Sequence, residues 1–179
     1  STDIAEIMGK AQFDWVAIDM EHGSISNSNL PDLFRALQLG NTLPLVRIQE
    51  GTMSNCKEAL DAGAGGIIIP MIESAKELEK IIKWSKWPPY GSRGVGFSRA
   101  NLFGKNFEEY KQESKSSLII AQIENIKALN NLSEICDVDG LDAIIIGPYD
   151  LSASLNLTGQ LNDSKVIDAC EKAFDICQE

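Results

Sequence analysis

Five short apolar runs recur along the chain, and they set the expected architecture. They lie at about 13–20, 43–48, 66–71, 118–123 and 141–146. Each run is rich in Ile, Leu or Val and is bounded by polar or turn residues, which is typical of a buried strand. Because the apolar residues are continuous instead of alternating with polar ones, we expect a parallel sheet that is covered on both faces.

Segments with apolar residues at helical spacing separate these runs. Pro31 suits the first turn of one helix, and Ser74 followed three residues later by Glu77 indicates a capping box at the start of another. The pattern predicts a helix followed by five β-α repeats. Helices are expected at about 3–11, 30–39, 52–63, 74–84, 107–112, 125–140 and 164–177.

The repeats indicate a single α/β domain over residues 1–179, and we expect it to have the TIM (β/α)8 barrel fold. A complete barrel of this kind usually needs about 250 residues. With 179 residues and five convincing strands, we expect a partial barrel that lacks the first strand and the last two. A smaller, complete open sheet is the alternative.

The charge balance argues against several classes of partner. The formal net charge is −10, and no basic stripe is present that could neutralise nucleic-acid phosphates or bind an anionic membrane surface. No apolar run reaches the length needed to span a bilayer, and no basic-plus-apolar leader begins at Ser1. We therefore expect a cytoplasmic protein that binds neither nucleic acid nor membrane.

The cysteines do not indicate a metal or redox site. None of the four belongs to a CxxC pair, the usual spacing of a zinc ribbon or a thioredoxin-like site. We expect reduced and mostly buried thiols. They are Cys56, Cys136, Cys170 and Cys177.

Polar residues gather where the predicted strands end. In a parallel α/β sheet the carboxyl ends of the strands share one edge, and such folds bind their ligands there. The stretch from 118 to 150 is central, because two apolar runs that each lead into a carboxylate are joined by a helical segment. This β-α-β unit should bring the two acids to the same edge. The strand-end residues are Asp19, Glu21, His22, Arg47, Gln122, Glu124 and Asp150.

The residue types at this edge fit a metal-assisted acid-base site. Gln122 and Glu124 are two residues apart and share a strand face, and oxygen ligands of this kind suit Mg²⁺ or Mn²⁺ better than zinc. His22 is the only histidine and is a natural general base, and Arg47 can hold a carboxylate or stabilise an oxyanion. Each residue has an ordinary alternative, namely a helix cap, a solvated imidazole or a structural ion pair. Their coincidence at matching strand ends favours a site.

The segment from 90 to 115 breaks the β-α rhythm. It is long, polar and rich in glycine, and long insertions in compact domains are more often functional than idle. Its RGVGFS stretch lacks the third glycine of a dinucleotide-binding loop, and no helix clearly follows it. We expect the loop from 91 to 106 to contribute to the site or to a subunit interface.

An ordered set of motifs resembles a known enzyme family. The motifs are FDWVAIDMEHG, LVRI, ALDAGAGGIIIPM, YGSRGVGFSRAN, AQIEN and GPYDLSASL. Together they resemble the metal-dependent (class II) pyruvate aldolases of the 4-hydroxy-2-oxoheptanedioate (2,4-dihydroxyhept-2-ene-1,7-dioate) aldolase family. The 2-keto-3-deoxy sugar acid aldolases are close relatives, and the citrate lyase branch is more distant. The resemblance covers nearly the whole chain.

The resemblance implies a metal site and a pyruvate site. Glu124 and Asp150 would bind a divalent cation, with Mg²⁺ or Mn²⁺ expected and Co²⁺ or Zn²⁺ as alternatives. The cation would chelate the keto and carboxylate oxygens of pyruvate. Gln122 and the backbone near Tyr149 would hold the pyruvate end, beside the Asp150 ligand. Asp19 would orient the base or the aldehyde end.

The resemblance also assigns the reacting groups. His22 would be the base, acting through a metal-bound water, and Arg47 would stabilise the enolate oxygen. Asp61 would raise the basicity of His22. Without the resemblance Asp61, in ALDAGA at a helix end, reads as a solvated helix residue.

The function implied is a carbon-carbon lyase that cleaves a 4-hydroxy-2-oxo acid to pyruvate and an aldehyde. Cleavage leaves a pyruvate enolate, which a metal can stabilise as a Lewis acid. No Schiff-base lysine is obvious at a strand end, which favours the metal route. A citrate-lyase-like enzyme acting on acyl-CoA and a non-catalytic barrel with a retained metal site are the alternatives. The resemblance also implies a homo-oligomer, commonly a hexamer, that takes a small 2-oxo acid as substrate.

Overall fold

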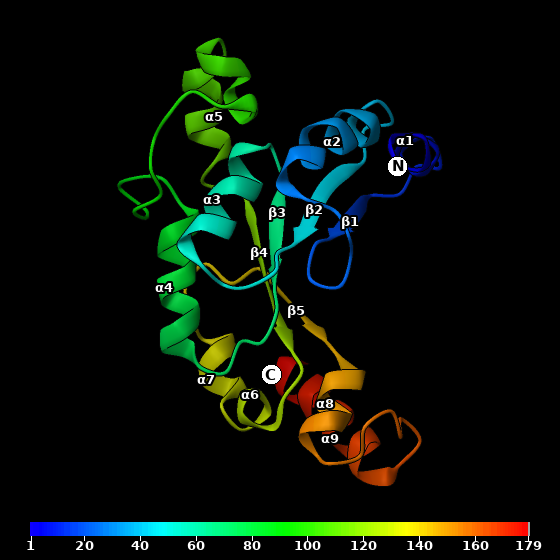
Figure 1. Ribbon diagram of the computed structural model, residues 1–179. Coiled ribbons are helices and arrows are strands. Elements are labelled where there is room, and N and C mark those ends of the chain that lie inside the picture. Colours follow the sequence, from blue (N-terminus) through cyan, green and yellow to red (C-terminus); the bar gives the residue numbers. More distant parts are fainter. Residues whose placement is uncertain (179) are drawn as a thin grey trace.

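The computed structural model describes residues 1–178 and contains a parallel sheet with helices between its strands (Figure 1). The strands match the five apolar runs of the sequence. They are β1 (Trp15–Asp19), β2 (Leu43–Arg47), β3 (Gly66–Ile69), β4 (Leu118–Ile123) and β5 (Ala143–Ile146).

Helices fill the connections, as the spacing of apolar residues predicts. None of the helices described over residues 1–178 is long and apolar enough to cross a membrane. The α-helices are α1 (Thr2–Lys10), α2 (Leu30–Gln38), α3 (Met53–Asp61), α4 (Ala75–Ser85), α5 (Phe107–Glu113), α6 (Ile126–Asn130), α7 (Leu132–Cys136), α8 (Pro148–Ser154) and α9 (Ser164–Gln178). Two 3₁₀ segments are η1 (Asn27–Asn29) and η2 (Arg99–Gly104).

The strand order is sequential, and this decides the type of sheet. The order is β1-β2-β3-β4-β5, and each strand is parallel to the next. A doubly wound sheet would instead reverse its order part-way across. The five strands form a curled sheet that resembles half of a barrel. The prediction of a parallel α/β architecture with five strands is therefore confirmed.

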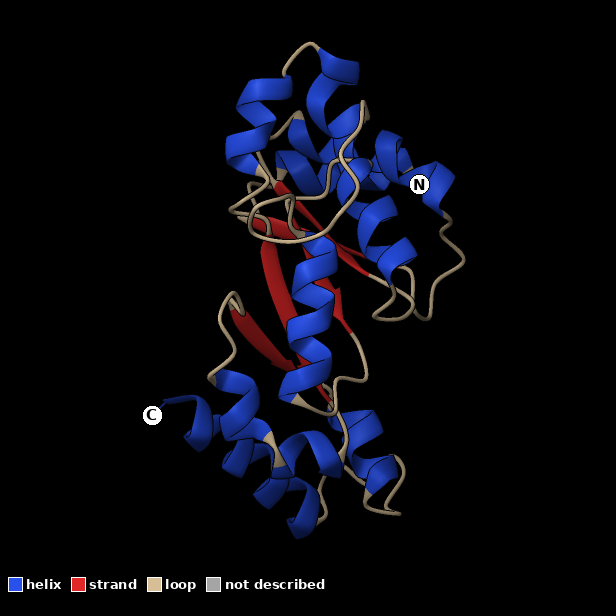
Figure 2. Ribbon diagram, turned by 90° about the vertical axis from the view of Figure 1, so that its left-hand side faces the viewer, coloured by secondary structure: helices blue, strands red, loops and turns tan. Residues whose placement is uncertain are grey.

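One face of the sheet packs against the helices and forms the main core. Val46, Ile67 and Ile119 are fully buried on this face. The α2 side chains Phe34 and Leu37, also fully buried, belong to the same apolar cluster. Helix α4 lies against this face and crosses in front of the strands in Figure 2. Burial of this apolar surface is the main driving force for folding.

The other face of the sheet is lined by a smaller apolar set. Leu45, Ile68 and Ile120 form a separate buried cluster, against which Ala17 and Ile145 pack. Because side chains alternate along a strand, the residues two positions further along β1, β2 and β4 share this inner face. Those positions carry polar side chains, so the inner face is apolar at its floor and polar at the carboxyl edge.

Side-chain caps begin several of the helices. The Thr52 and Asn125 side chains accept hydrogen bonds from the backbone N–H groups three residues on, at 3.2 and 2.8 Å. Ser74 does the same for the N–H of Glu77, at 3.3 Å, as predicted. The Glu77 carboxylate, however, accepts from the N–H of Glu73 at 3.0 Å and not from that of Ser74. The expected capping box is therefore shifted by one residue.

The chain departs from the predicted helices in two places. The single helix expected over 125–140 is divided at Asn131, whose φ of −103° and ψ of 9° interrupt the helical path. Helix α8 was not expected, although Pro148 at its first position is a common helix start. Its consequence is that Asp150 lies in the first turn of a helix rather than in a loop.

The cysteines are free thiols, as predicted, but the expectation that most are buried is wrong, because Cys136 and Cys170 are partly exposed. Cys56 is fully buried, and burial raises the pKa of its thiol to about 11. A thiol in this environment stays protonated at neutral pH and is a poor nucleophile. Cys177 is exposed.

The contrast between Leu37 of α2 and Leu39, just beyond the end of that helix, provides a test of this packing. Leu37 is fully buried, whereas Leu39, two residues on, is 63% exposed. Leu37→Ala is expected to lower the free energy of unfolding by about 2–5 kcal/mol, because it removes core contacts and leaves a cavity. Leu39→Ala should change it by less than about 0.5 kcal/mol. Urea denaturation measures both, and equal effects would contradict the assignment of the core.

Candidate active site at the carboxyl ends of the strands

Four predicted site residues lie together on the inner face of the sheet. Asp19 ends β1 and Arg47 ends β2, and the two are directly opposite each other in the parallel register. Gln122 lies on β4, and Glu124 follows that strand by one residue. The structure therefore brings residues from three strands to one edge, as the strand-end argument predicts.

Arg47 connects the members of this cluster. Its Nε and Nη2 atoms donate to the two carboxylate oxygens of Asp19, at 2.9 and 2.6 Å. Its Nη1 atom donates to Gln122 Oε1 at 3.4 Å and lies 3.2 Å from Glu21 Oε2. The bidentate pair is a strong form of charge-assisted hydrogen bonding. It lowers the pKa of Asp19, chiefly through the hydrogen bond from Arg47.

Glu124 is almost completely enclosed. It is 1% exposed, one of its oxygens accepts from the backbone N–H of Met71 at 2.6 Å, and the other accepts from the Gln122 side-chain amide. A Cβ atom at Gly147 would lie 2.9 Å from Glu124 Oε2, so only glycine lets the turn after β5 approach the carboxylate so closely. The turn that leads into α8 thus packs directly against Glu124.

Asp150 and Tyr149 lie at the start of α8. Both are exposed, and Tyr149 is 67% exposed. The Gly147 N–H donates to Ile123 O at 2.9 Å, which fixes the beginning of this helix beside the end of β4. Asp150 therefore lies one helical turn after Gly147, the glycine that packs against Glu124.

His22 lies in the turn after β1 with an open side chain. The imidazole is 64% exposed. Its backbone N–H donates to Asp19 Oδ1 at 3.4 Å, and the N–H of Glu21 donates to the same oxygen at 3.0 Å. Asp19 therefore shapes this turn as well as holding Arg47. An exposed imidazole at the rim of the cluster is accessible to a substrate.

The structure does not bring Asp61 to this group. Helix α3 runs from the carboxyl edge of the sheet towards the amino edge, and Asp61 is its last residue. Gly65, four residues on, donates to Pro44 O at the amino end of β2. The Asp61 carboxylate pairs with Lys57 at 3.0 Å on its own helix. Within this chain Asp61 therefore lies at the opposite edge, and its action on His22 stays a prediction of the resemblance.

Glu21, one of the strand-end residues named from the sequence but given no role there, also lies in this cluster. Its side chain is 13% exposed. Burial, followed by the negative charge of Glu124, raises the pKa of its carboxyl group. In the sequence, the feature that indicated Glu21 was its position two residues after Asp19. That spacing places the two side chains on the same side of an extended chain.

The donor chemistry of the cluster fits a hard divalent cation. Glu124 presents a buried carboxylate, and among residues 1–178 it forms no ion pair with a lysine or arginine. An uncompensated buried charge is costly. No group of three or more His, Cys, Asp or Glu side chains in the described chain is arranged to hold a metal. Glu124, and Asp150 beyond the turn that packs against it, are the carboxylates that could hold such a cation.

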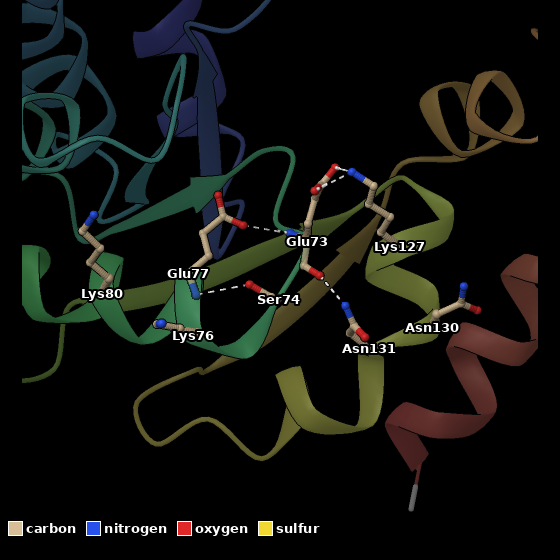
Figure 3. A pocket seen from close by; sticks show the side chains of 8 residues that line it. All are labelled: Glu73, Ser74, Lys76, Glu77, Lys80, Lys127, Asn130 and Asn131. Carbon is tan, nitrogen blue, oxygen red and sulfur yellow. Dashed lines mark hydrogen bonds and ion pairs between the residues drawn. The ribbon is translucent and has the colours of Figure 1, made fainter.

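A separate depression lies on the outer helical layer and has a different character. It has a volume of about 620 Å³ and is lined at the start of α4 and along α6 and its junction with α7. Figure 3 shows that its polar groups already bind one another: Lys127 pairs with Glu73 at 3.1 Å, and Asn131 donates to Glu73 O at 2.8 Å. It offers no cluster of reactive groups comparable with the strand-end site.

The profile of the HpcH/HpaI aldolase/citrate lyase family matches residues 1–179. The chain belongs to this family. Its curated relatives include a hydroxypyruvate/pyruvate aldolase of Roseobacter denitrificans, 39% identical over 158 residues, which cover 87% of this chain and 62% of the relative. A 2-keto-3-deoxy-L-rhamnonate aldolase of Escherichia coli is 40% identical over 155 residues, which cover 85% of this chain and 58% of the relative. The chain thus spans about three fifths of the length of these relatives.

Solved structures of family members share the fold. An HpcH/HpaI aldolase/citrate lyase family protein from Burkholderia cenocepacia superposes with a TM-score of 0.94 at 29% identity, covering 99% of this chain and 72% of that one. The HpcH/HpaI aldolase from Desulfitobacterium hafniense gives a TM-score of 0.90 at 34% identity, covering 99% and 70%. The resemblance drawn from the sequence motifs is therefore confirmed at the level of the family.

The pairing of Asp19 with Arg47 predicts a pH-dependent contribution to stability. Because the pKa of Asp19 is lowered on folding, the stabilisation is present above the ordinary value and is lost as the pH falls through the lower folded value. Asp19→Asn should cost about 0.5–1 kcal/mol at pH 7, a figure reduced for partial exposure. Urea unfolding at several pH values measures this.

A matched control for this test is the exposed pair of Asp32 and Arg35 on α2. Asp32→Asn should cost less than about 0.5 kcal/mol at any pH. An Asp19→Asn deficit that does not shrink as the pH is lowered from 7 into the acid range would contradict the ion-pair explanation.

Proposed function

We propose that the protein is a metal-dependent aldolase that cleaves a 4-hydroxy-2-oxo acid to pyruvate and an aldehyde. The observation that carries this proposal is the enclosed Glu124 carboxylate, which has no ion-pair partner among residues 1–178 and shares a sheet edge with Arg47 and His22. Membership of an aldolase/citrate lyase family supports it. So do the aldolase names of the Roseobacter denitrificans and Escherichia coli relatives.

The two carboxylates would hold the cation. When it is bound by Glu124 and Asp150, a divalent metal supplies Lewis-acid chemistry that favours the enolate over the ketone. Mg²⁺ or Mn²⁺ suits the oxygen donors, with Co²⁺ or Zn²⁺ as alternatives. Gln122, on the same inner face as Glu124, and the backbone near Tyr149 would hold the pyruvate end.

The proton and electron movements can be assigned to this chain's own residues. His22 would accept the proton of the 4-hydroxyl, and the C3–C4 bond would break to release the aldehyde. The electron pair of that bond passes into the enolate at C2 and C3 of the remaining 2-oxo acid. A proton returned to C3 then gives pyruvate.

Arg47 would stabilise the enolate oxygen. Asp19 occupies its Nε and Nη2 atoms, so Nη1 is the nitrogen left to face the interior, towards Gln122 and Glu21. A donor fixed in place before reaction stabilises a developing oxyanion without the cost of reorganisation. Asp19 would thus act by orienting Arg47 and would border the aldehyde end of the substrate.

We also propose that the five strands are part of an eight-stranded TIM barrel. The coverage of relatives, at 58–72% of their length, supports this. Homo-oligomer formation, the hexamer in particular, and a cytoplasmic location stay predictions of the resemblance. The role of the loop at 91–106 in the site or an interface is likewise a prediction.

Loss of Glu124 is expected to abolish the reaction. Glu124→Gln keeps the shape of the side chain but removes the charge that would hold the cation. Pyruvate release from a 4-hydroxy-2-oxo acid, followed with a lactate dehydrogenase couple, should fall below about 1% of wild type. Chelation of the wild-type protein should have the same effect, and added Mg²⁺ or Mn²⁺ should restore activity.

The matched control is Glu73→Gln, which alters the depression in Figure 3 and should leave the rate unchanged. The proposal fails if Glu124→Gln retains wild-type activity, or if wild-type activity survives complete chelation. Turnover of an acyl-CoA thioester, with none of a 4-hydroxy-2-oxo acid, would favour a citrate-lyase-like enzyme instead.

Substitution of Arg47 separates orientation from simple charge. Arg47→Lys keeps the positive charge but cannot bind Asp19 through two nitrogens while directing a third to the interior. We expect kcat to fall about 100- to 1000-fold with a smaller change in KM, because the lost interaction belongs to the transition state. Steady-state kinetics measure both constants. A rise in KM alone would show that Arg47 only binds substrate.

A further inference from the structure

The turn after β3 contains a residue in a strained backbone conformation. Met71 follows that strand by two residues and has a φ of 57°, in the left-handed region that is unfavourable for a residue with a bulky side chain. Pro70 and Ile72, on either side, are buried, whereas Met71 is 50% exposed. The buried neighbours therefore hold the chain in a conformation that methionine does not favour. Such strain persists only where the surrounding structure imposes it, and it concentrates at functional sites.

The N–H group of Met71 has an unusual acceptor. Gln12, Asn41 and Asn156 also have a positive φ, and each donates its N–H to the backbone carbonyl three residues earlier, which closes a local turn. The Met71 N–H donates instead to a side chain, with its nitrogen 2.6 Å from Glu124 Oε1. The left-handed conformation of Met71 therefore accompanies a contact between the ends of β3 and β4, and not a local turn.

The two oxygens of the Glu124 carboxylate face different neighbours. Oε1 accepts from the Met71 N–H, and Oε2 accepts from the side-chain amide of Gln122. A Cβ atom at Gly147 would lie 2.9 Å from Oε2, so this oxygen lies on the side of the turn that leads to Asp150. The Met71 contact thus limits the rotation of the carboxylate and keeps Oε2 on that side.

We propose that Met71 is the positioning residue for the carboxylate that would bind the cation, with its N–H holding Glu124 Oε1 and leaving Oε2 as the coordinating oxygen. The presence of a cation here rests on the proposed aldolase function. A carboxylate whose rotation is fixed beforehand loses less conformational freedom when the cation binds. Loss of a partner that orients a metal ligand typically weakens metal binding by about 10- to 100-fold.

The exposure of Met71 makes its backbone contribution separable from packing. Because the side chain is half exposed, its replacement removes little core contact. Asparagine adopts a positive φ more readily than methionine, whereas a β-branched residue such as valine is a genuine outlier there. Met71→Asn should therefore keep the direction of the N–H group, and Met71→Val should lose it.

The first test measures Mn²⁺ binding to the purified protein by calorimetry. Met71→Val should raise the dissociation constant about tenfold or more, because the turn relaxes and the N–H no longer holds Glu124. Met71→Asn should stay within about threefold of wild type, as expected for a substitution that removes no interaction. A wild-type affinity in Met71→Val overturns the proposal.

The matched control is Asn41→Val. Asn41 is exposed and has a φ of 62°, but it precedes β2 at the opposite edge of the sheet. The substitution should destabilise the protein through the same backbone effect, yet change the Mn²⁺ dissociation constant less than about twofold, because the two places are independent. An equal loss of affinity in Asn41→Val and Met71→Val overturns the proposal, because Mn²⁺ binding would then only follow stability.

The second test needs neither a cation nor activity. Urea denaturation in the presence of a chelator gives the unfolding equilibrium constants of wild type, Met71→Val, Glu124→Met and the double variant. Glu124→Met removes both acceptor oxygens at similar volume, so the increase caused by Met71→Val should be at least about threefold smaller in that background. Asn41→Val should have the same effect in both backgrounds, within about twofold. Independent effects of Met71→Val and Glu124→Met overturn the proposal.

Turnover separates the role of Met71 from the proposed function. Pyruvate release by Met71→Val should be low at limiting Mn²⁺ and restored at saturating Mn²⁺. A loss that persists at saturating Mn²⁺ with an unchanged Mn²⁺ affinity overturns the proposal, because Met71 would then act on the substrate. If the wild-type protein binds Mn²⁺ but releases no pyruvate, the proposed function fails, and the Mn²⁺ affinities still decide the role of Met71. Wild-type protein that binds no Mn²⁺ overturns both proposals.

Discussion

The guanidinium group of Arg47 is the interaction on which the arrangement of the site depends. It binds Asp19 of the neighbouring strand through two nitrogens and directs the third towards Gln122 and Glu21. One side chain therefore connects β1, β2 and β4. The parallel register that places Asp19 opposite Arg47 makes this possible. A slip of one residue would turn either side chain to the helical face.

This register is set by the apolar pattern and not by the polar residues themselves. On one face, Val46, Ile67 and Ile119 must meet the helices. That requirement leaves Leu45, Ile68 and the residues in register with them for the inner face. Because the strands end on the same side, the polar position that follows each inner apolar residue falls at one edge. Core packing thus positions the site before any catalytic group interacts with another.

The carboxylates at this edge carry more negative charge than Arg47 alone can balance. Arg47 is already committed to Asp19 and lies against Glu21. Glu124 is enclosed with hydrogen-bond donors but no ion-pair partner among residues 1–178, and Asp150 lies just beyond the turn that touches it. Backbone N–H groups can stabilise part of a buried charge but do not neutralise it. A divalent cation shared by Glu124 and Asp150 would complete the balance, which is why we assign these two residues and not His22 to metal binding.

The sequence predicts the structural features that depend on the repeating pattern of apolar residues. It misses those that depend on the backbone conformation of a single residue. The strands, and the polar residues at their ends, follow from continuous apolar runs. The capped starts of α3 and α4 follow from Thr52 and Ser74. The break at Asn131 and the start of α8 depend on local backbone geometry that no hydrophobic pattern records.

Two acids, Asp61 and Glu21, show the same limit. Asp61 matches a family motif, but the direction of α3 carries it to the far edge of the sheet, where Lys57 binds it. Glu21 is one of the polar residues at the predicted strand ends, but the sequence assigns it no role. It becomes informative only when the fold buries it between Arg47 and His22. Motif position therefore identifies a candidate, whereas the burial of a carboxylate and the charges that face it show what it contacts within this chain.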